Sequence, residues 1–330
     1  MRIKVFGVHN GEIEALEKWQ ERNKIELSLS SEILSIANVD EIVDFDGVCL
    51  QQVEPVEDEE IYRKISEFGV KQITVRTAGY DMIDLEYAHK YHLLVTNVPA
   101  YSPNAIAEMA LTHTMNLIRK MYITQLKVAR KDFTWDGSLA PEIRMLTIGI
   151  IGVGRIGGVY AKLVAGLGAK VIGYDIAPNQ CINPDVEYQD SLDDVLQKAD
   201  LISLHVPLDQ TTEYLINKDT LKLMKTTAYL VNTSRGKVVN SSALINALEN
   251  GELAGAALDV IEEENEYFGN DYSAKIINDK NINKFLELEN VYVTPHIAFY
   301  TKTALQNMVD ISLDSVVDIV KTGSSKNIIK

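Results

Sequence analysis

Cysteine is scarce in this chain of 330 residues, which contains only Cys49 and Cys181. The two stand far apart, and neither belongs to a CxxC motif or to a cluster of cysteine and histidine. We therefore expect no zinc centre or other metal site, and no disulfide framework. Cys49 lies in a short apolar run and is expected to be a small core residue.

Basic residues and long apolar runs are also in short supply. The chain has 32 Lys and Arg against 47 Asp and Glu, a formal net charge of −15. Such a surface repels phosphate, so we expect no nucleic-acid partner. No apolar run reaches the length of a membrane span, and the first residues do not have the pattern of a signal peptide. We expect no membrane partner and a cytoplasmic location.

A glycine-rich turn stands in the middle of the chain, where Gly152, Gly154 and Gly157 follow the apolar run 147–151. A strand that ends in such a turn and opens a helix presents backbone N–H groups to a pyrophosphate. Asp175 ends the next apolar run, 18 residues after Gly157, where a carboxylate can bind both ribose hydroxyls. No Arg or Lys follows it closely to hold a 2′-phosphate, so the pattern predicts NAD. The alternative is a structural turn with a solvated aspartate.

Short apolar runs alternate with helical stretches along the whole chain, which is typical of parallel sheets covered by helices on both faces. In the first part we expect strands at 2–8, 25–30, 46–50, 71–77 and 93–98, and helices at 11–22, 57–67 and 84–90. From the glycine turn onward we expect six strands, at 147–152, 169–175, 201–206, 228–233, 255–260 and 291–294. Six strands that begin with this turn match a complete Rossmann domain.

Two helices are expected to connect these parts. One begins at Ser102-Pro103 and runs to about Arg130, either as a core helix or as a bridge between domains or subunits. The other, at about 301–321, is expected to return to the first domain. The polar segment 262–284 is either a functional loop with a short helix or a surface excursion.

The predicted fold class is therefore α/β, with a doubly wound Rossmann NAD-binding domain inserted into a smaller flavodoxin-like substrate domain. We expect the substrate domain to comprise 1–101 and 299–330, and the NAD-binding domain to comprise 102–298. The active site is expected in the cleft between them.

Three polar residues, Arg235, Glu264 and His296, follow the later strands, where parallel sheets usually carry function. Arg235 can grip a carboxylate through its planar fork, and His296 can deliver a proton to a carbonyl oxygen. A neighbouring glutamate would favour the protonated imidazole. Each residue taken singly has a structural alternative. The arginine also fits a structural ion pair, and the histidine also fits a hydrogen-bonded structural group. The glutamates at 262–264 also fit a solvent-exposed surface. The sequence leaves open which glutamate reaches a histidine.

Seven motifs in order resemble the NAD-dependent D-2-hydroxyacid dehydrogenases, and most closely the bacterial D-lactate dehydrogenases. The motifs cover 76–84, 97–103, 152–157, 205–207, 232–236, 259–264 and 294–298. The resemblance implies that Arg235 binds the substrate carboxylate and carbonyl, that His296 is the proton donor, and that Glu264 pairs with it. Formate dehydrogenases of this fold carry Gln at the position of Glu264. The glutamate in this chain therefore favours a hydroxyacid substrate.

Further site residues follow from the resemblance. The substrate-binding residues are Ala78, Gly79, Tyr101, Leu50 and Phe299. D-lactate enzymes often carry Tyr at the position of Leu50, so Leu50 either indicates a roomier pocket or completes a core strand. The cofactor-binding residues are Gly152, Gly154, Arg155, Ile156, Gly157, Asp175, Val206, Pro207, Thr212, Thr233, Ser234 and Asp259. Thr212 replaces an Asn that is common in relatives.

The resemblance implies a homodimer that transfers hydride between NADH and a small 2-oxo acid, with pyruvate and D-lactate as the first expectation. A D-2-hydroxyisocaproate-type enzyme for bulkier 2-oxo acids is the alternative. A non-enzymatic, NAD-sensing corepressor shares the fold and is the more remote alternative.

Overall fold

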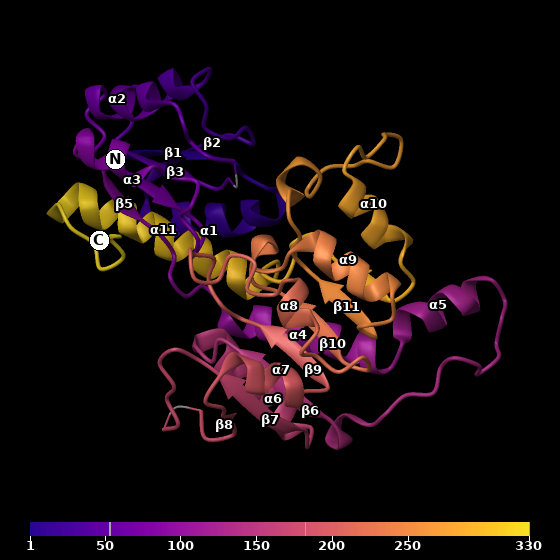
Figure 1. The fold of residues 1–330 in the computed structure, drawn as a ribbon. Helices are drawn as coiled ribbons and strands as arrows, with labels where there is room; N and C mark the ends of the chain where they lie inside the picture. Colours follow the sequence, from indigo (N-terminus) through magenta and orange to yellow (C-terminus); the bar gives the residue numbers. More distant parts are fainter. Residues whose placement is uncertain (53, 182, 330) are drawn as a thin grey trace. The chain divides into compact units, whose positions relative to one another are not determined.

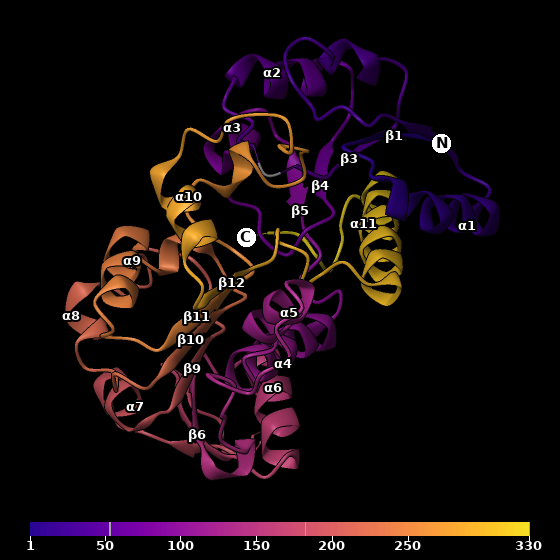
Figure 2. The ribbon, with the colours of Figure 1, turned by 90° about the vertical axis from the view of Figure 1, so that its right-hand side faces the viewer.

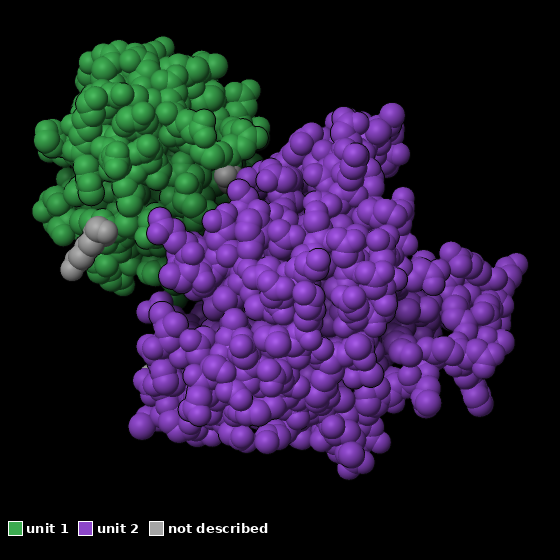
Figure 3. All heavy atoms as spheres, in the orientation of Figure 1, with its two compact units in different colours: residues 1–102, 300–330 green, residues 103–299 purple. Residues whose placement is uncertain are grey.

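The chain forms two compact units in the computed structural model, which describes residues 1–52, 54–181 and 183–329 (Figure 1). Unit 1 consists of residues 1–102 and 300–330, and unit 2 consists of residues 103–299 (Figure 3). Each unit has its own sheet, and every strand pair described in either sheet is parallel. The predicted α/β fold class is confirmed.

The sheet of unit 1 has five strands in the order β2-β1-β3-β4-β5. The order changes direction at β1, which pairs with both β2 and β3, as in flavodoxin-like sheets. The strands are β1 (Arg2–Phe6), β2 (Glu26–Leu29), β3 (Gly47–Leu50), β4 (Gln72–Val75) and β5 (Leu94–Thr96).

Helices cover both faces of this sheet (Figure 2). They are α1 (Ile13–Asn23) and α11 (Lys302–Thr322) on one face and α2 (Glu59–Glu67) and α3 (Leu85–Lys90) on the other, with short 3₁₀ turns η1 (Asn10–Glu12) and η2 (Val39–Ile42). Val309, Leu313 and Val316 of α11 are buried in one cluster with Leu16 and Trp19 of α1. The C-terminal helix therefore contributes to the core of unit 1.

The sheet of unit 2 has seven strands in the order β12-β11-β10-β9-β6-β7-β8. This is the doubly wound Rossmann order with one additional strand, and the direction reverses at β6, the strand that leads into the glycine turn. The strands are β6 (Thr147–Ile151), β7 (Lys170–Tyr174), β8 (Glu187–Tyr188), β9 (Leu201–Leu204), β10 (Tyr229–Asn232), β11 (Gly255–Leu258) and β12 (Val291–Val293). The edge strand β8 was not predicted.

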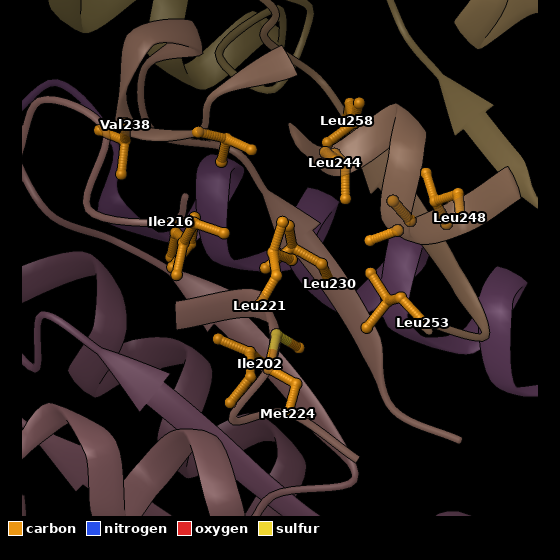
Figure 4. Packing of buried hydrophobic residues seen from close by; sticks show 14 of the residues in the cluster. Ile202, Ile216, Leu221, Met224, Leu230, Val238, Leu244, Leu248, Leu253 and Leu258 are labelled. Carbon is orange, nitrogen blue, oxygen red and sulfur yellow. The ribbon is translucent and has the colours of Figure 1, made fainter. Parts of the chain in front are cut away.

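Two hydrophobic cores lie on the two faces of this sheet. The helices are α4 (Pro103–Ile118), α5 (Met121–Ala129), α6 (Arg155–Gly166), α7 (Leu192–Lys198), α8 (Lys218–Leu221), α9 (Ser241–Glu249) and α10 (Lys280–Glu287), with 3₁₀ turns η3 (Ile143–Met145), η4 (Gly236–Val238) and η5 (Glu264–Glu266). Helices α4 and α6 pack on one face. On the other, Ile202, Leu230 and Leu258 from three strands are buried in one cluster with Leu244 and Leu248 of α9 (Figure 4).

The prediction of one helix from Ser102 to about Arg130 is wrong. The chain leaves the helical conformation at Lys120, which has a left-handed backbone with φ of +50°, and α5 begins after it. Leu117 is buried against the sheet, whereas Met121, one helical turn later, is 41% exposed. The helix ends where the sheet no longer covers it. In the described part of the chain, no helix combines the length and apolar character needed to span a bilayer.

Candidate active site

The glycine turn joins β6 to α6, and two of its glycines are required by the backbone. Gly152 has a φ of +87°, and a Cβ there would lie 2.8 Å from the carbonyl carbon of His205. A Cβ on Gly157 would lie 2.1 Å from the carbonyl oxygen of Gly152. Both contacts are too short for a side chain, so these glycines allow strand and helix to meet tightly.

Gly154 has a different role, because a Cβ there would meet no atom within 4 Å. It is the N-cap of α6, and Arg155 and Ile156 are the first two residues of the helix. The space beside Gly154 therefore adjoins the N-terminal end of the helix, and a side chain would fill it. This arrangement fits the pyrophosphate of a dinucleotide.

Asp175 follows β7 and lies beside the same turn. Its Oδ2 accepts a 2.7 Å hydrogen bond from the backbone N–H of Val153, and its Oδ1 accepts one from Ala177 at 2.8 Å. The carboxylate is thus fixed next to the turn, where a ribose would be expected.

The loop after β9 contains further residues predicted to bind the cofactor. Val206 adjoins the glycine turn, because its Cγ1 would lie 2.8 Å from a Cβ on Gly152. The hydroxyl of Thr212 donates to the carbonyl oxygen of Pro207 at 2.7 Å and accepts from the N–H of Asp209 at 2.8 Å. Thr212 therefore holds its own loop together in this structure.

The loop after β10 carries Thr233, Ser234 and Arg235. The N–H and hydroxyl of Ser234 both donate to Oδ1 of Asn232, at 3.0 and 2.7 Å, and Nδ2 of Asn232 donates to the Arg235 carbonyl at 2.9 Å. The Thr233 hydroxyl is buried and has no hydrogen-bond partner among the described residues. Buried polar groups normally have a partner, so this hydroxyl is suited to a bound ligand.

Glu264 and His296 form a close pair. Nδ1 of His296 lies 2.6 Å from Oε1 of Glu264, and the other oxygen, Oε2, accepts the N–H of Ile261 at 2.8 Å. The histidine side chain is 33% exposed and the glutamate side chain 13%. Because Nδ1 is bound to the carboxylate, Nε2 is the ring nitrogen that can serve a substrate.

The structure distinguishes the three consecutive glutamates. Glu262 accepts the N–H of Ser241 at 2.7 Å, and its hydrogen bond with the Tyr214 hydroxyl raises the pKa of that tyrosine to about 12. Glu263 has a left-handed backbone with φ of +56°. Glu264 is the member of the run that reaches His296.

Asp259 is buried after β11 and holds the turn that carries His296. Its Oδ1 accepts from the Thr294 hydroxyl at 2.5 Å and from the N–H of Ile297 at 3.0 Å, and its Oδ2 accepts from Ala298 at 2.9 Å. The N–H of His296 donates to the Asp259 carbonyl at 2.8 Å. These contacts give Asp259 a structural role, and its predicted contact with the nicotinamide stays a prediction.

Unit 1 contains the loop predicted to bind the substrate carboxylate. The backbone carbonyl oxygens of Ala78 and Gly79 in this loop already accept hydrogen bonds from side chains. The Thr77 hydroxyl donates to the Gly79 carbonyl at 2.6 Å, and Nδ2 of Asn97 donates to the Ala78 carbonyl at 2.7 Å. Among the described residues, the N–H groups of Ala78 and Gly79 have no acceptor. Arg76 is buried at the start of the loop, where its guanidinium binds Glu12 at 3.1 Å.

The other predicted substrate residues are placed as follows. Leu50 is fully buried in the core cluster of unit 1, together with Phe6 and Val75. The carbonyl of Tyr101 accepts from Asn307 at 2.6 Å. The ring of Phe299 lies edge-on to His296, with ring centroids 6.2 Å apart. No group of three or more His, Cys, Asp or Glu suited to a metal occurs in the described residues.

Residues 111–298 match the family model for the NAD-binding domain of the D-isomer-specific 2-hydroxyacid dehydrogenases. The chain belongs to this family. It is 44% identical to a D-2-hydroxyacid dehydrogenase (NAD(+)) of Clostridioides difficile over 329 residues, 99% of each chain. It is 40% identical to a D-lactate dehydrogenase of Staphylococcus aureus (strain MRSA252) over 324 residues, 98% of each.

Solved structures of dehydrogenases agree with this assignment. A D-lactate dehydrogenase with NAD+ from Lactobacillus jensenii matches with a TM-score of 0.89 and 40% identity over 100% of both chains. A D-2-hydroxyisocaproate dehydrogenase matches with a TM-score of 0.92 and 35% identity, over 100% of this chain and 99% of that one. The protein is thus an NAD-dependent D-2-hydroxyacid dehydrogenase, as predicted, and the corepressor alternative gains no support.

Two residues near this dehydrogenase site were not among the site residues predicted from the sequence. A Cβ on Gly236 would lie 2.1 Å from the Ile261 carbonyl oxygen, so this glycine lets the Arg235 loop pack against the segment that leads to Glu264. Gly236 is the last residue of the motif 232–236 after β10, and this position was the sequence signal that could have identified it. The second residue is His113. It lies on the apolar side of α4, where a buried polar side chain needs a hydrogen-bond partner, and this was the signal in the sequence.

Proposed function

We propose that the enzyme reduces pyruvate to D-lactate with NADH. The observation that carries the proposal is the 2.6 Å contact between His296 and Glu264 on the same sheet edge as Arg235. The names of relatives at 40% identity support pyruvate. A bulkier 2-oxo acid is the second candidate, because a D-2-hydroxyisocaproate dehydrogenase matches with a TM-score of 0.92. The burial of Leu50 in a core cluster weakens the sequence argument for a roomier pocket.

We assign the proton transfer to Nε2 of His296. When bound, NADH supplies the hydride that adds to the carbonyl carbon of the substrate. His296 gives a proton to the carbonyl oxygen, so the ketone becomes a secondary alcohol and the imidazole becomes neutral. Glu264 fixes the ring through Nδ1. Arg235 binds the substrate carboxylate and polarises the carbonyl through its fixed charge.

The proposed cofactor contacts follow the geometry of unit 2. Gly154, Arg155 and Ile156 would hold the pyrophosphate at the start of α6. Asp175 would accept the ribose hydroxyls, and the buried Thr233 hydroxyl would gain the partner that it lacks among the described residues.

In unit 1 we propose that the N–H groups of Ala78 and Gly79 bind the substrate carboxylate. Adjacent N–H groups in a glycine-containing loop can form such an anion site. The carbonyl groups of both residues are already bonded, which fixes the loop. Tyr101 is proposed to border the substrate.

We propose a homodimer in the cytoplasm. The segment after α5 exposes large apolar side chains, with Phe133 73%, Trp135 90% and Leu139 91% exposed, and exposed apolar side chains of this kind are typical of an interface. Light scattering should give the mass of a dimer, and a W135E variant should shift the measured mass toward that of the monomer.

The state of the cysteines supports the proposed cytoplasmic location. Cys49 and Cys181 are free thiols, which fits a reducing compartment.

The test of the reaction is turnover. Purified enzyme with NADH is offered pyruvate, 2-oxoisocaproate and phenylpyruvate, and chiral chromatography identifies the product. We expect the highest kcat/KM with pyruvate and only the D-isomer. A higher value with a longer side chain would favour the second candidate, and no NADH oxidation with any of the three would overturn the proposal.

A further inference from the structure

A buried histidine lies behind the site and takes no part in the mechanism above. His113 is on α4, on the side of the helix that packs against β10 and β11, and none of its surface is exposed. Its ring stands edge-on to Tyr292, with centroids 5.4 Å apart. Burying an imidazole here costs free energy unless its ring nitrogens are hydrogen-bonded, whereas a leucine would fill the space with no polar atom. We therefore expect the histidine to make a hydrogen bond that matters for the structure or the reaction.

His113 is the outer end of a chain of hydrogen bonds that leads to Asp259. Its Nε2 lies 3.1 Å from the Thr294 hydroxyl, which lies 2.5 Å from Oδ1 of Asp259. The hydroxyl has a single proton. A carboxylate oxygen can only accept, so the proton goes to Asp259, and Thr294 must then accept from Nε2–H of His113.

We propose that His113 is a positioning residue for the reaction: its Nε2–H holds the Thr294 hydroxyl on Asp259 and thereby fixes the turn that carries His296. This inference rests on the proposed role of His296. Asp259 also accepts the N–H groups of Ile297 and Ala298, so the carboxylate connects both ends of the turn.

The turn needs this support. His296 has a left-handed backbone with φ of +52°, a conformation that non-glycine residues adopt only where surrounding contacts hold it. A shift of the turn would move Nε2 of His296 away from the carbonyl oxygen while leaving the cofactor cradle in place. Burial lowers the pKa of His113 to about 4, so near neutral pH its ring is an uncharged donor to Thr294.

The experiment compares two substitutions of His113 with a matched control. H113L removes the donor and keeps an apolar side chain of similar size, whereas H113Q retains an N–H near the position of Nε2. The control is T114V. Thr114 is the next residue of α4, is equally buried, and shares a 2.7 Å hydrogen bond with the Tyr160 hydroxyl, outside the chain to Asp259.

Two readouts are measured for each variant: steady-state kinetics, and hydrogen exchange of the Ile297 and Ala298 amides. For H113L we expect kcat to fall about tenfold or more, as for a displaced catalytic group, with the KM for NADH within about twofold. The two amides should exchange faster. H113Q should recover most of kcat and protection, and T114V should match the wild type in both.

A second pair tests the same hydroxyl where H113L does not fold. T294V should lower kcat and speed the exchange of the two amides as expected for H113L, and T294S should stay near the wild type. If H113L does fold, adding it to T294V should change little more. The inference is overturned when H113L keeps its kcat, or when H113Q and T114V lose as much as H113L. An inactive wild type would contradict the proposed function instead, and the exchange of the two amides would still test the role of His113 in the turn.

Discussion

Replacing Gly154 with alanine should separate cofactor binding from folding. A Cβ at this position meets no atom within 4 Å, and φ of −77° suits alanine, so the free energy of unfolding should change by no more than about 1 kcal/mol. The same Cβ would occupy the space that the pyrophosphate needs. Weakening two hydrogen bonds to a charged phosphate should cost about 3 kcal/mol in all, which is about a 100-fold rise in the Kd of NADH.

Calorimetric titration with NADH and thermal unfolding measure the two effects. The matched control is G166A, because Gly166 is the last residue of the same helix and a Cβ there also meets nothing within 4 Å. G166A should leave the Kd unchanged and stabilise slightly. G157A should instead lose stability, since its Cβ would lie 2.1 Å from the Gly152 carbonyl oxygen. If G154A binds NADH as tightly as the wild type, the assignment of the cradle is refuted.

Three further predictions concern charges in unit 2. E264Q should lower kcat, because the carboxylate 2.6 Å from Nδ1 of His296 fixes the imidazole ring, and the Kd of NADH should stay unchanged; a wild-type kcat would show that the pair plays no part in catalysis. R235K should raise the KM for the 2-oxo acid about tenfold or more, since lysine lacks the planar fork, with the Kd of NADH as the control. Burial lowers the pKa of His113 to about 4 and that of His205 to about 3, from an ordinary value of 6.5. The unfolded chain therefore binds more protons below pH 6.5, and at pH 5 urea denaturation should show a loss of about 4 kcal/mol for the two together, about half of it absent in H205Q. Stability that stays flat from pH 7 to 5 would contradict this.

The sheets were predictable from sequence because buried parallel strands read as short apolar runs. The edge strand β8 was missed because it is only two residues long, one of them exposed, and carries no such run. The helix break at Lys120 was missed because neither glycine nor proline marks it. The spacing from Leu117 to Met121 continued the apolar pattern, although the sheet that would cover it ends there.

The site was predictable where a single residue type is required by chemistry. The tight backbone of the turn requires its glycines. Binding of the ribose hydroxyls requires the carboxylate of the aspartate after β7. The sequence could not resolve which of three consecutive glutamates reaches His296, because that depends on how the loop after β11 folds back. His113 was hidden by its apolar neighbours, and its partner Thr294 lies 181 positions away along the chain.

The most direct test of the account is the reaction of an H296Q variant. Glutamine keeps a polar side chain but cannot act as the acid, so we expect NADH to bind with the wild-type Kd while reduction of the 2-oxo acid falls by about 10² or more. Fluorescence titration gives the binding, and single-turnover absorbance of NADH gives the chemistry. Wild-type turnover in H296Q with NADH bound would contradict the assignment of His296 as the proton donor.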